Sequence, residues 1–169
     1  WYDVFYHDYQ AIYYGIEFFS LLHQHDYFIP EQSLPAMLEL YKTAYYKIDT
    51  AYRKFYVHYD LSLNKEMLHP LKERLENMYH QEFINQLALK WTNRLEQEKQ
   101  WKLPNVPQQS HFFKEWVLPF QNRKERIFVI ISDALRYEVA HELFTKLNTE
   151  RKGSTQIDCI QGVIPSFTA

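Results

Sequence analysis

Residues 34–59 read LPAMLELYKTAYYKIDTAYRKFYVHY, and their apolar positions repeat at intervals of three and four residues. This spacing places the side chains on one face of an α-helix, so one side of the helix is predicted to be continuously buried. Ser33 before the stretch and Pro35 near its start are typical of a helix N-terminus. The predicted core positions are Leu34, Met37, Tyr41, Ala44, Ile48, Tyr52, Phe55 and Tyr59.

Helical spacing continues on both sides of this stretch. After it, two apolar stripes separated by a slip between Met78 and Phe83 predict one kinked helix, or two abutting helices, to about Trp101. An aromatic content of 18% with only 3 glycines favours long packed helices over turn-rich β-sandwiches. Before it, a helix to about Leu22 is predicted to carry on one face Phe5, Tyr9, Ile12, Ile16 and Phe19, and this face is widened by Tyr14, Phe18 and Leu21.

The last third of the chain has a different pattern. Prolines in residues 102–110 mark a linker, followed by a short helix and a charged turn at residues 122–126. Residues 127–131, all apolar, predict a central strand covered on both faces. Helical spacing from Leu135 to Leu147 predicts a helix that ends before Gly153, and residues 155–160 predict a second strand. We therefore expect a mostly helical region over residues 1–121, followed by the opening βαβ unit of an α/β domain over residues 122–169.

Two polar positions follow the predicted strands. Asp133 comes after the first strand, where carboxylates of α/β proteins bind metals or phosphates, although an Asp here is equally typical of a helix N-cap before Ala134. Thr168 follows the second strand, so its hydroxyl is expected at the same edge of the sheet. A hydroxyl becomes a good nucleophile only when a cation or a base takes its proton, and Ser166 is a competing candidate.

Arg136 is a candidate phosphate-binding residue because it lies in the first helical turn after Asp133. The alternative is an ion pair on the helix surface with Glu138 or Glu142. The sequence alone leaves both interpretations open.

Residues 127–138, IFVIISDALRYE, resemble the signature strand and turn of PglZ proteins of bacterial BREX antiphage defence, and residues 162–169 resemble the segment that follows it. Residues 46–60 are similar to the region before that domain in type 1 BREX members. The resemblance implies a truncated domain of the alkaline phosphatase superfamily with two divalent cations, zinc or manganese. It further implies that Asp133 is a metal ligand and that Thr168 is both a metal ligand and the nucleophile. The other ligands are expected outside this chain, which by itself is expected to be metal-free.

The implied function is that of a metal-dependent phosphodiesterase or phosphatase in phage defence, acting on a phosphate ester or a nucleic acid. The alternative is a non-catalytic assembly subunit that binds other BREX proteins, such as the system's DNA methyltransferase. A third interpretation takes residues 127–133 as the metal-binding strand of an NTPase. The sequence contains no Gly-rich phosphate loop that ends in Gly-Lys-Ser/Thr, which argues against the NTPase.

Composition excludes several other classes. A net charge of -2 gives no electrostatic signature of nucleic-acid binding, and the single Cys159 excludes a disulfide within the chain. No apolar run has the length of a membrane span, so we expect a cytoplasmic protein without membrane contact. The 8 histidines are predicted to be surface or packing residues. Because the chain starts at Trp1 and stops at Ala169 in a predicted loop, we expect a fragment of a longer protein.

Overall fold

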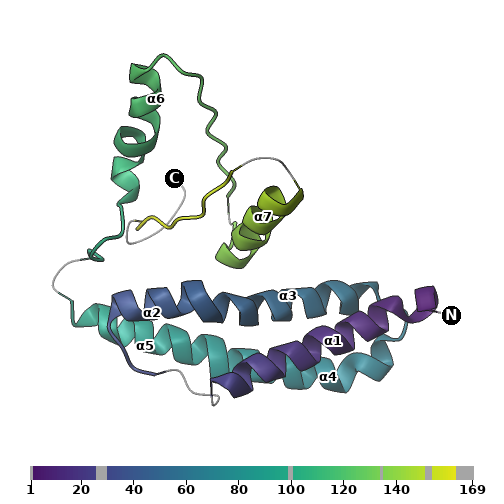
Figure 1. The fold of residues 1–169 in the computed structure, drawn as a ribbon. Helices are drawn as coiled ribbons and strands as arrows, with labels where there is room; N and C mark the ends of the chain where they lie inside the picture. The colour runs from purple at the N-terminus through teal and green to yellow at the C-terminus, as the bar shows by residue number, and fades with distance from the viewer. Residues whose placement is uncertain (1, 26–29, 99–100, 134, 151–153, 163–169) are drawn as a thin grey trace. The chain divides into compact units, whose positions relative to one another are not determined.

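The structure is a computed structural model that describes residues 2–25, 30–98, 101–133, 135–150 and 154–162 (Figure 1). The chain forms two compact units, residues 1–97 and residues 98–169. Every regular element of the described residues is a helix. Among the described residues, no helix is both long enough and apolar enough to cross a bilayer.

The first unit is built from three long helical rods. Helix α1 packs mainly along α3 and also contacts α4. Two of the rods each contain a π-helical segment, η1 or η2, between two α-helices that continue one another (Figure 1). The bounds are α1 Tyr2–Gln24; α2 Leu34–Leu40, η1 Tyr41–Tyr45 and α3 Tyr46–Leu61; α4 Lys65–Asn77, η2 Met78–Ile84 and α5 Asn85–Glu96.

The prediction for residues 34–59 is confirmed. The rod formed by α2, η1 and α3 spans them without a break, and the Ser33 hydroxyl accepts a hydrogen bond from the Ala36 amide at 3.4 Å. All the predicted core positions are buried or partly buried. Phe55 of α3 and Phe18 of α1 have no exposed surface, and a fully buried side chain of this size stabilises a fold by about 1.5–3 kcal/mol.

The π-helical segments shift the register of the buried side chains. A π turn accommodates an additional residue, so the helix after it is rotated relative to the helix before it. In η1 the consequence is that Tyr45, which the helical spacing did not select, is 1% exposed, whereas Ala44 is only partly buried. Segment η2 coincides with the slip between Met78 and Phe83 and accounts for the two displaced stripes. The prediction of one kinked or two abutting helices is therefore confirmed, with the end at Glu96.

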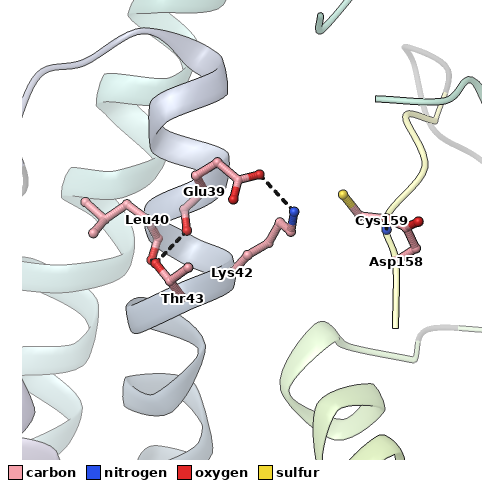
Figure 2. Close-up of polar contacts among 6 residues, drawn as sticks. All are labelled: Glu39, Leu40, Lys42, Thr43, Asp158 and Cys159. Atoms are coloured by element: carbon pink, nitrogen blue, oxygen red, sulfur yellow. Dashed lines mark hydrogen bonds and ion pairs between the residues drawn. The ribbon is translucent and has the colours of Figure 1, made fainter. Parts of the chain in front are cut away.

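Figure 2 shows polar contacts at the start of η1. The Thr43 hydroxyl donates to the Glu39 carbonyl oxygen at 2.7 Å, and the Lys42 ammonium lies 2.8 Å from the Glu39 carboxylate. Backbone hydrogen bonds join residues four apart in an α-helix and five apart in a π-helix. At the change from one to the other, the Thr43 hydroxyl provides an additional donor for a backbone carbonyl oxygen. The exposed ion pair contributes less than about 1 kcal/mol, so these contacts set local geometry more than stability.

Helix α1 confirms the helix predicted to end near Leu22, and its buried face matches the predicted one in part. Phe18 of the widened face is fully buried, and Ile12 and Phe19 pack against the core. Tyr9 and Ile16 of the predicted stripe are instead 45% and 64% exposed. Apolar side chains surround this helix, so periodicity could not separate all its buried positions from the exposed ones. A helix of this kind is typical of a position covered on more than one side.

Close approach attaches α1 to α4, and buried polar contacts attach it to the loop between α3 and α4. Gly15 lies against Leu71 so closely that a Cβ atom at residue 15 would be 3.2 Å from the nearest methyl group. Further along, Asp8 of α1 accepts hydrogen bonds from the Ser62 hydroxyl and from the Asn64 amide group, the latter at 2.6 Å. Asp8 and Ser62 are buried, so both polar groups are satisfied inside the unit.

The described residues of the second unit form four helical elements, of which only α7 is longer than five residues. The short helix predicted after the linker is present as the π-helical segment η4, which α6 continues. The charged turn is also confirmed: Lys124 has a φ angle of 57°, and the Arg123 guanidinium pairs with Glu125 at 2.8 Å. The bounds are η3 Gln109–His111, η4 Phe113–Val117, α6 Leu118–Asn122 and α7 Tyr137–Glu150, the last confirming the helix predicted before Gly153.

The predicted βαβ unit is wrong. The described residues contain no strand, and neither residues 127–131 nor residues 155–160 form one. Phe128, Ile130 and Ile131 are 84%, 91% and 90% exposed, the opposite of a central strand. A strand exists only where a neighbouring strand completes its hydrogen-bond ladder, and an apolar composition cannot supply that neighbour. The supported fold is therefore helical.

Candidate functional site

Asp133 lies in an exposed turn between the apolar residues 127–131 and helix α7. Helix α7 begins at Tyr137, and its first hydrogen bonds run to the carbonyl oxygen of Arg136, at 3.1 and 3.0 Å. The cap interpretation of Asp133 required a helix that starts at residue 134, and the observed helix starts later in the chain. Asp133 thus presents its carboxylate at the surface before the helix.

An ion pair joins Arg136 to Glu138 at the start of α7. The Arg136 Nε atom lies 3.0 Å from the Glu138 Oε1 atom, and the two side chains differ sharply in exposure, 50% for Arg136 and none for Glu138. Of the two pairing alternatives for Arg136, the structure shows the one with Glu138. Glu142 lies 3.9 Å from Lys146 on the same helix. Positive partial charge at a helix N-terminus favours a carboxylate in the first turn.

Thr168 and Ser166, the two candidate nucleophiles, lie outside the described residues. The chain that leads toward them is described as far as Gly162, whose carbonyl oxygen accepts a hydrogen bond from the Trp101 indole at 2.8 Å. In sequence, the described part of this segment ends on Gln161 and Gly162.

Gln161 is attached to the linker through all its polar groups. Its backbone N–H donates to the Pro107 carbonyl at 2.7 Å, and its own carbonyl accepts from the Gln109 amide at 2.9 Å. Its side-chain oxygen accepts from the Leu103 amide at 2.7 Å, while its side-chain nitrogen donates to the Trp101 carbonyl at 2.8 Å. The residue is 5% exposed. Sequence reasoning missed it, because a lone glutamine beside a glycine carries no recognisable signal.

Cys159 and Asp158 precede this attachment. The Cys159 backbone amide donates to the Asp158 carboxylate at 3.0 Å (Figure 2), a local contact between adjacent residues. This contact does not place Asp158 or Cys159 as a second metal ligand next to Asp133.

A complete metal centre is not present in the described residues: they form no group of three or more His, Cys, Asp and Glu side chains that could hold an ion. Asp133 is a suitable oxygen donor, but one carboxylate does not bind a divalent cation in a defined geometry. Several histidines pack against aromatic rings, as His58 does against Tyr14 with a centroid separation of 5.6 Å. His69 and His111 instead lie 3.4 and 3.7 Å from glutamates four residues further along the chain.

A second buried carboxylate belongs to the helical unit. Asp49 is 1% exposed and accepts hydrogen bonds from the Tyr41 hydroxyl at 2.5 Å and the Tyr79 hydroxyl at 2.8 Å. Tyr79 also stacks on Tyr52 with ring centroids 3.7 Å apart. The two hydroxyls come from the two π-helical segments, so Asp49 links η1 to η2. Because its surroundings are packed rings, its role is to hold the bundle together.

Comparison with known proteins defines the class. The model of a family described as "BREX system PglZ alkaline phosphatase-like domain" matches residues 112–169. This segment contains Asp133, Arg136, Glu138 and Thr168. The second unit thus carries sequence of an alkaline-phosphatase-like domain, although the described residues show only helices.

Two relatives extend the match beyond that segment. The alkaline phosphatase-like protein PglZ of Bacillus cereus (strain H3081.97) is 45% identical over 170 residues, which cover 99% of this chain and 20% of the relative. The alkaline phosphatase-like protein BrxZ of Escherichia coli O9:H4 (strain HS) is 41% identical over 130 residues, 73% of this chain and 15% of the relative. No solved structure matches.

The chain belongs to the PglZ-domain proteins of BREX systems. The resemblance of residues 127–138 and 162–169 to that family is therefore confirmed. The chain spans about one fifth of the length of the Bacillus cereus relative.

Proposed function

We propose that the full-length protein acts in BREX antiphage defence as a divalent-metal-dependent phosphohydrolase. The match of residues 112–169 to an alkaline phosphatase-like domain is the observation that carries this proposal, because it includes both Asp133 and Thr168. In the proposal, Asp133 is a metal ligand, Thr168 is a metal ligand and the nucleophile, and Arg136 contacts a phosphate oxygen. Zinc or manganese is the proposed metal, with its other ligands supplied from outside this chain.

The proposed substrate is a phosphate ester, either a small phosphodiester or a nucleic acid. The Thr168 oxygen bonds to phosphorus as the bond to the leaving oxygen breaks, and the hydroxyl proton passes to that leaving group. Water then attacks the phosphorus bound to Thr168 and restores the hydroxyl, which releases a phosphate monoester from a diester substrate and inorganic phosphate from a monoester substrate. Ser166 remains the competing nucleophile, and a substitution at each position distinguishes them.

A second candidate function is that of a non-catalytic assembly subunit. It is favoured by the exposed apolar side chains on α1, which include Tyr9, Tyr13 and Ile16 at 45%, 58% and 64% exposure. Apolar side chains that recur on one outward face are typical of an interaction surface. In this alternative the protein binds other BREX proteins, for example the DNA methyltransferase.

The test is hydrolysis of a chromogenic phosphodiester and of DNA by the full-length protein, with and without Zn²⁺ or Mn²⁺. Asp133→Ala and Thr168→Ala are expected to abolish metal-dependent turnover, while Ser166→Ala retains it. Asp158→Asn is the control, since this carboxylate also lies in the second unit and contacts its neighbour's amide. Equal turnover in all variants would contradict the assignment. An inactive wild-type protein that still assembles with its partners would favour the second function.

A further inference from the structure

Glu138 is the most deeply buried described residue of α7. It is 1% exposed, whereas the apolar Leu143 on the same helix is 50% exposed. Burial of a carboxylate is unfavourable by several kcal/mol unless a partner of opposite charge or strong hydrogen bonds offset it. A buried carboxylate on a helix that also carries an exposed leucine is the reverse of ordinary helix packing. The position of Glu138 therefore calls for an explanation through its contacts.

The ion pair with Arg136 supplies that explanation. Glu138 is wholly buried and Arg136 is half exposed, so the pair has one fixed end inside the unit and one end at the surface. An arginine side chain loses considerable rotamer entropy when it binds an anion. The contact between Nε and Oε1 is an ion pair at 3.0 Å without hydrogen-bond geometry. Its attraction restricts the guanidinium before an anion arrives and so reduces this loss.

Three features direct this arginine toward an anionic ligand. It lies close to Asp133 in sequence, in the turn that precedes α7. The helix that starts at Tyr137 has 14 residues, and its N-terminal end carries positive partial charge. A guanidinium has five N–H donors, so a contact through Nε is compatible with a second contact to phosphate through the opposite edge.

We infer that Glu138 is a positioning residue that holds Arg136 for recognition of a phosphate group. The ligand class is a phosphate monoanion or dianion, free or as part of an ester. This inference deepens the proposed function and rests on it for the location of the phosphate beside Asp133. It adds a role for Glu138, which acts through Arg136 and does not contact the phosphate.

The test measures binding of inorganic phosphate to the full-length protein by calorimetry, without turnover. Arg136→Ala is expected to weaken binding by tenfold or more, and Glu138→Gln by about tenfold, as expected for loss of a charge-assisted contact. The double variant is expected to bind no more weakly than Arg136→Ala, because Glu138 acts only through that arginine. Glu142→Gln, a substitution of the same type one helical turn further along α7, is the control with unchanged binding.

Folding is checked by thermal unfolding of each variant. If Glu138→Gln does not fold, Glu138→Asp takes its place; this variant keeps the charge and shortens the reach, and the same loss of binding is expected. Unchanged phosphate binding in a folded Glu138 variant would overturn the inference, as would a wild-type protein that does not bind phosphate. A merely structural Glu138 would lower the unfolding temperature and leave phosphate affinity unaltered.

The two proposals fail separately. Phosphate binding that depends on Glu138 in a protein without hydrolytic activity would keep the inference and remove the hydrolase function. Metal-dependent hydrolysis with a KM that is equal in wild type, Glu138→Gln and Glu142→Gln would keep the hydrolase function and remove the inference about Glu138.

Discussion

The two units use apolar residues in opposite ways. In the helical unit, Phe18, Phe55 and Phe83 are completely buried against one another's helices. In the second unit, the apolar residues 127–131 are mostly exposed, and the most deeply buried described residue of α7 is a glutamate. An apolar pattern therefore shows which side chains are favourable to bury, whereas the neighbouring elements determine whether those side chains are buried.

The largest expected effect separates the two units directly. Phe55→Ala should lower the free energy of unfolding by about 3–5 kcal/mol, because it opens a cavity in a core that cannot collapse fully. Ile130→Ala, at a position 91% exposed, should change it by less than about 0.5 kcal/mol. Urea unfolding followed by circular dichroism measures both. Val57→Ala, on the same helix as Phe55 but 46% exposed, is the matched control. Similar losses for Phe55→Ala and Ile130→Ala would contradict the contrast between the units.

Asp49 gives the next largest effect. Asp49→Ala removes the shared acceptor of the Tyr41 and Tyr79 hydroxyls and should destabilise the helical unit by about 3 kcal/mol, since buried donors lose their partner. Asp49→Asn keeps one acceptor oxygen and should cost less. Urea unfolding of these two variants and of Tyr79→Phe measures how much of the lost unfolding free energy comes from the Tyr79 hydrogen bond alone. A loss no greater for Asp49→Ala than for Tyr79→Phe alone would show that the carboxylate does not link the two π-helical segments.

In the second unit, Gln161→Ala tests whether polar contacts substitute for a missing apolar core. The expected local loss is about 1–2 kcal/mol, because the Leu103 amide and the Trp101 carbonyl lose their side-chain partner. Amide hydrogen exchange should accelerate at Leu103 and change less at Gln109, whose acceptor is the backbone carbonyl of residue 161. Equal acceleration at both amides would indicate that the whole attachment opens, in which case the side chain is not its main support.

The smallest effect is a pH dependence in the helical unit. Burial, followed by the nearby charges of His7 and Lys54, lowers the pKa of His58 below its usual value of 6.5. The folded state therefore takes up a proton less readily than the unfolded chain. Stability from the neutral imidazole is present above pH 6.5 and is lost as the pH falls through the lowered pKa. Below that pKa the loss is complete and the dependence levels off.

His58→Gln should flatten this part of the stability profile, as measured by urea unfolding at a series of pH values. The neutral pair shares one hydrogen bond, with the two Nδ1 atoms of His7 and His58 3.0 Å apart, which two protonated rings could not make. His69→Gln is the control, because this ring is 55% exposed. An unchanged slope in His58→Gln would show that other groups produce the pH dependence.

Sequence periodicity predicted the helices well because α-helices make their hydrogen bonds within one segment. The rod over residues 34–59, the slip near Phe83 and the helix before Gly153 all follow from spacing. The buried face of α1 followed only in part, since apolar residues surround that helix and Tyr9 and Ile16 are exposed. The predicted strands failed for the complementary reason: strand formation depends on a partner elsewhere in the chain.

The candidate site divides in the same way. Asp133, Arg136 and Thr168 could be selected from residue type, position and resemblance to PglZ proteins. The buried Glu138 and the four hydrogen bonds of Gln161 could not, because both depend on contacts that no local pattern encodes.

The sequence by itself determined the helical segments, the family and the residue types available for phosphate chemistry, since each is written in short stretches of neighbouring residues. Only the tertiary structure decided which of the apolar positions of α1 are covered, how Asp49 joins two π-helical segments, and which carboxylate holds Arg136. The physical reason is that burial and hydrogen-bond partners arise between residues distant in the chain, such as Tyr79 and Asp49 or Gln161 and Leu103.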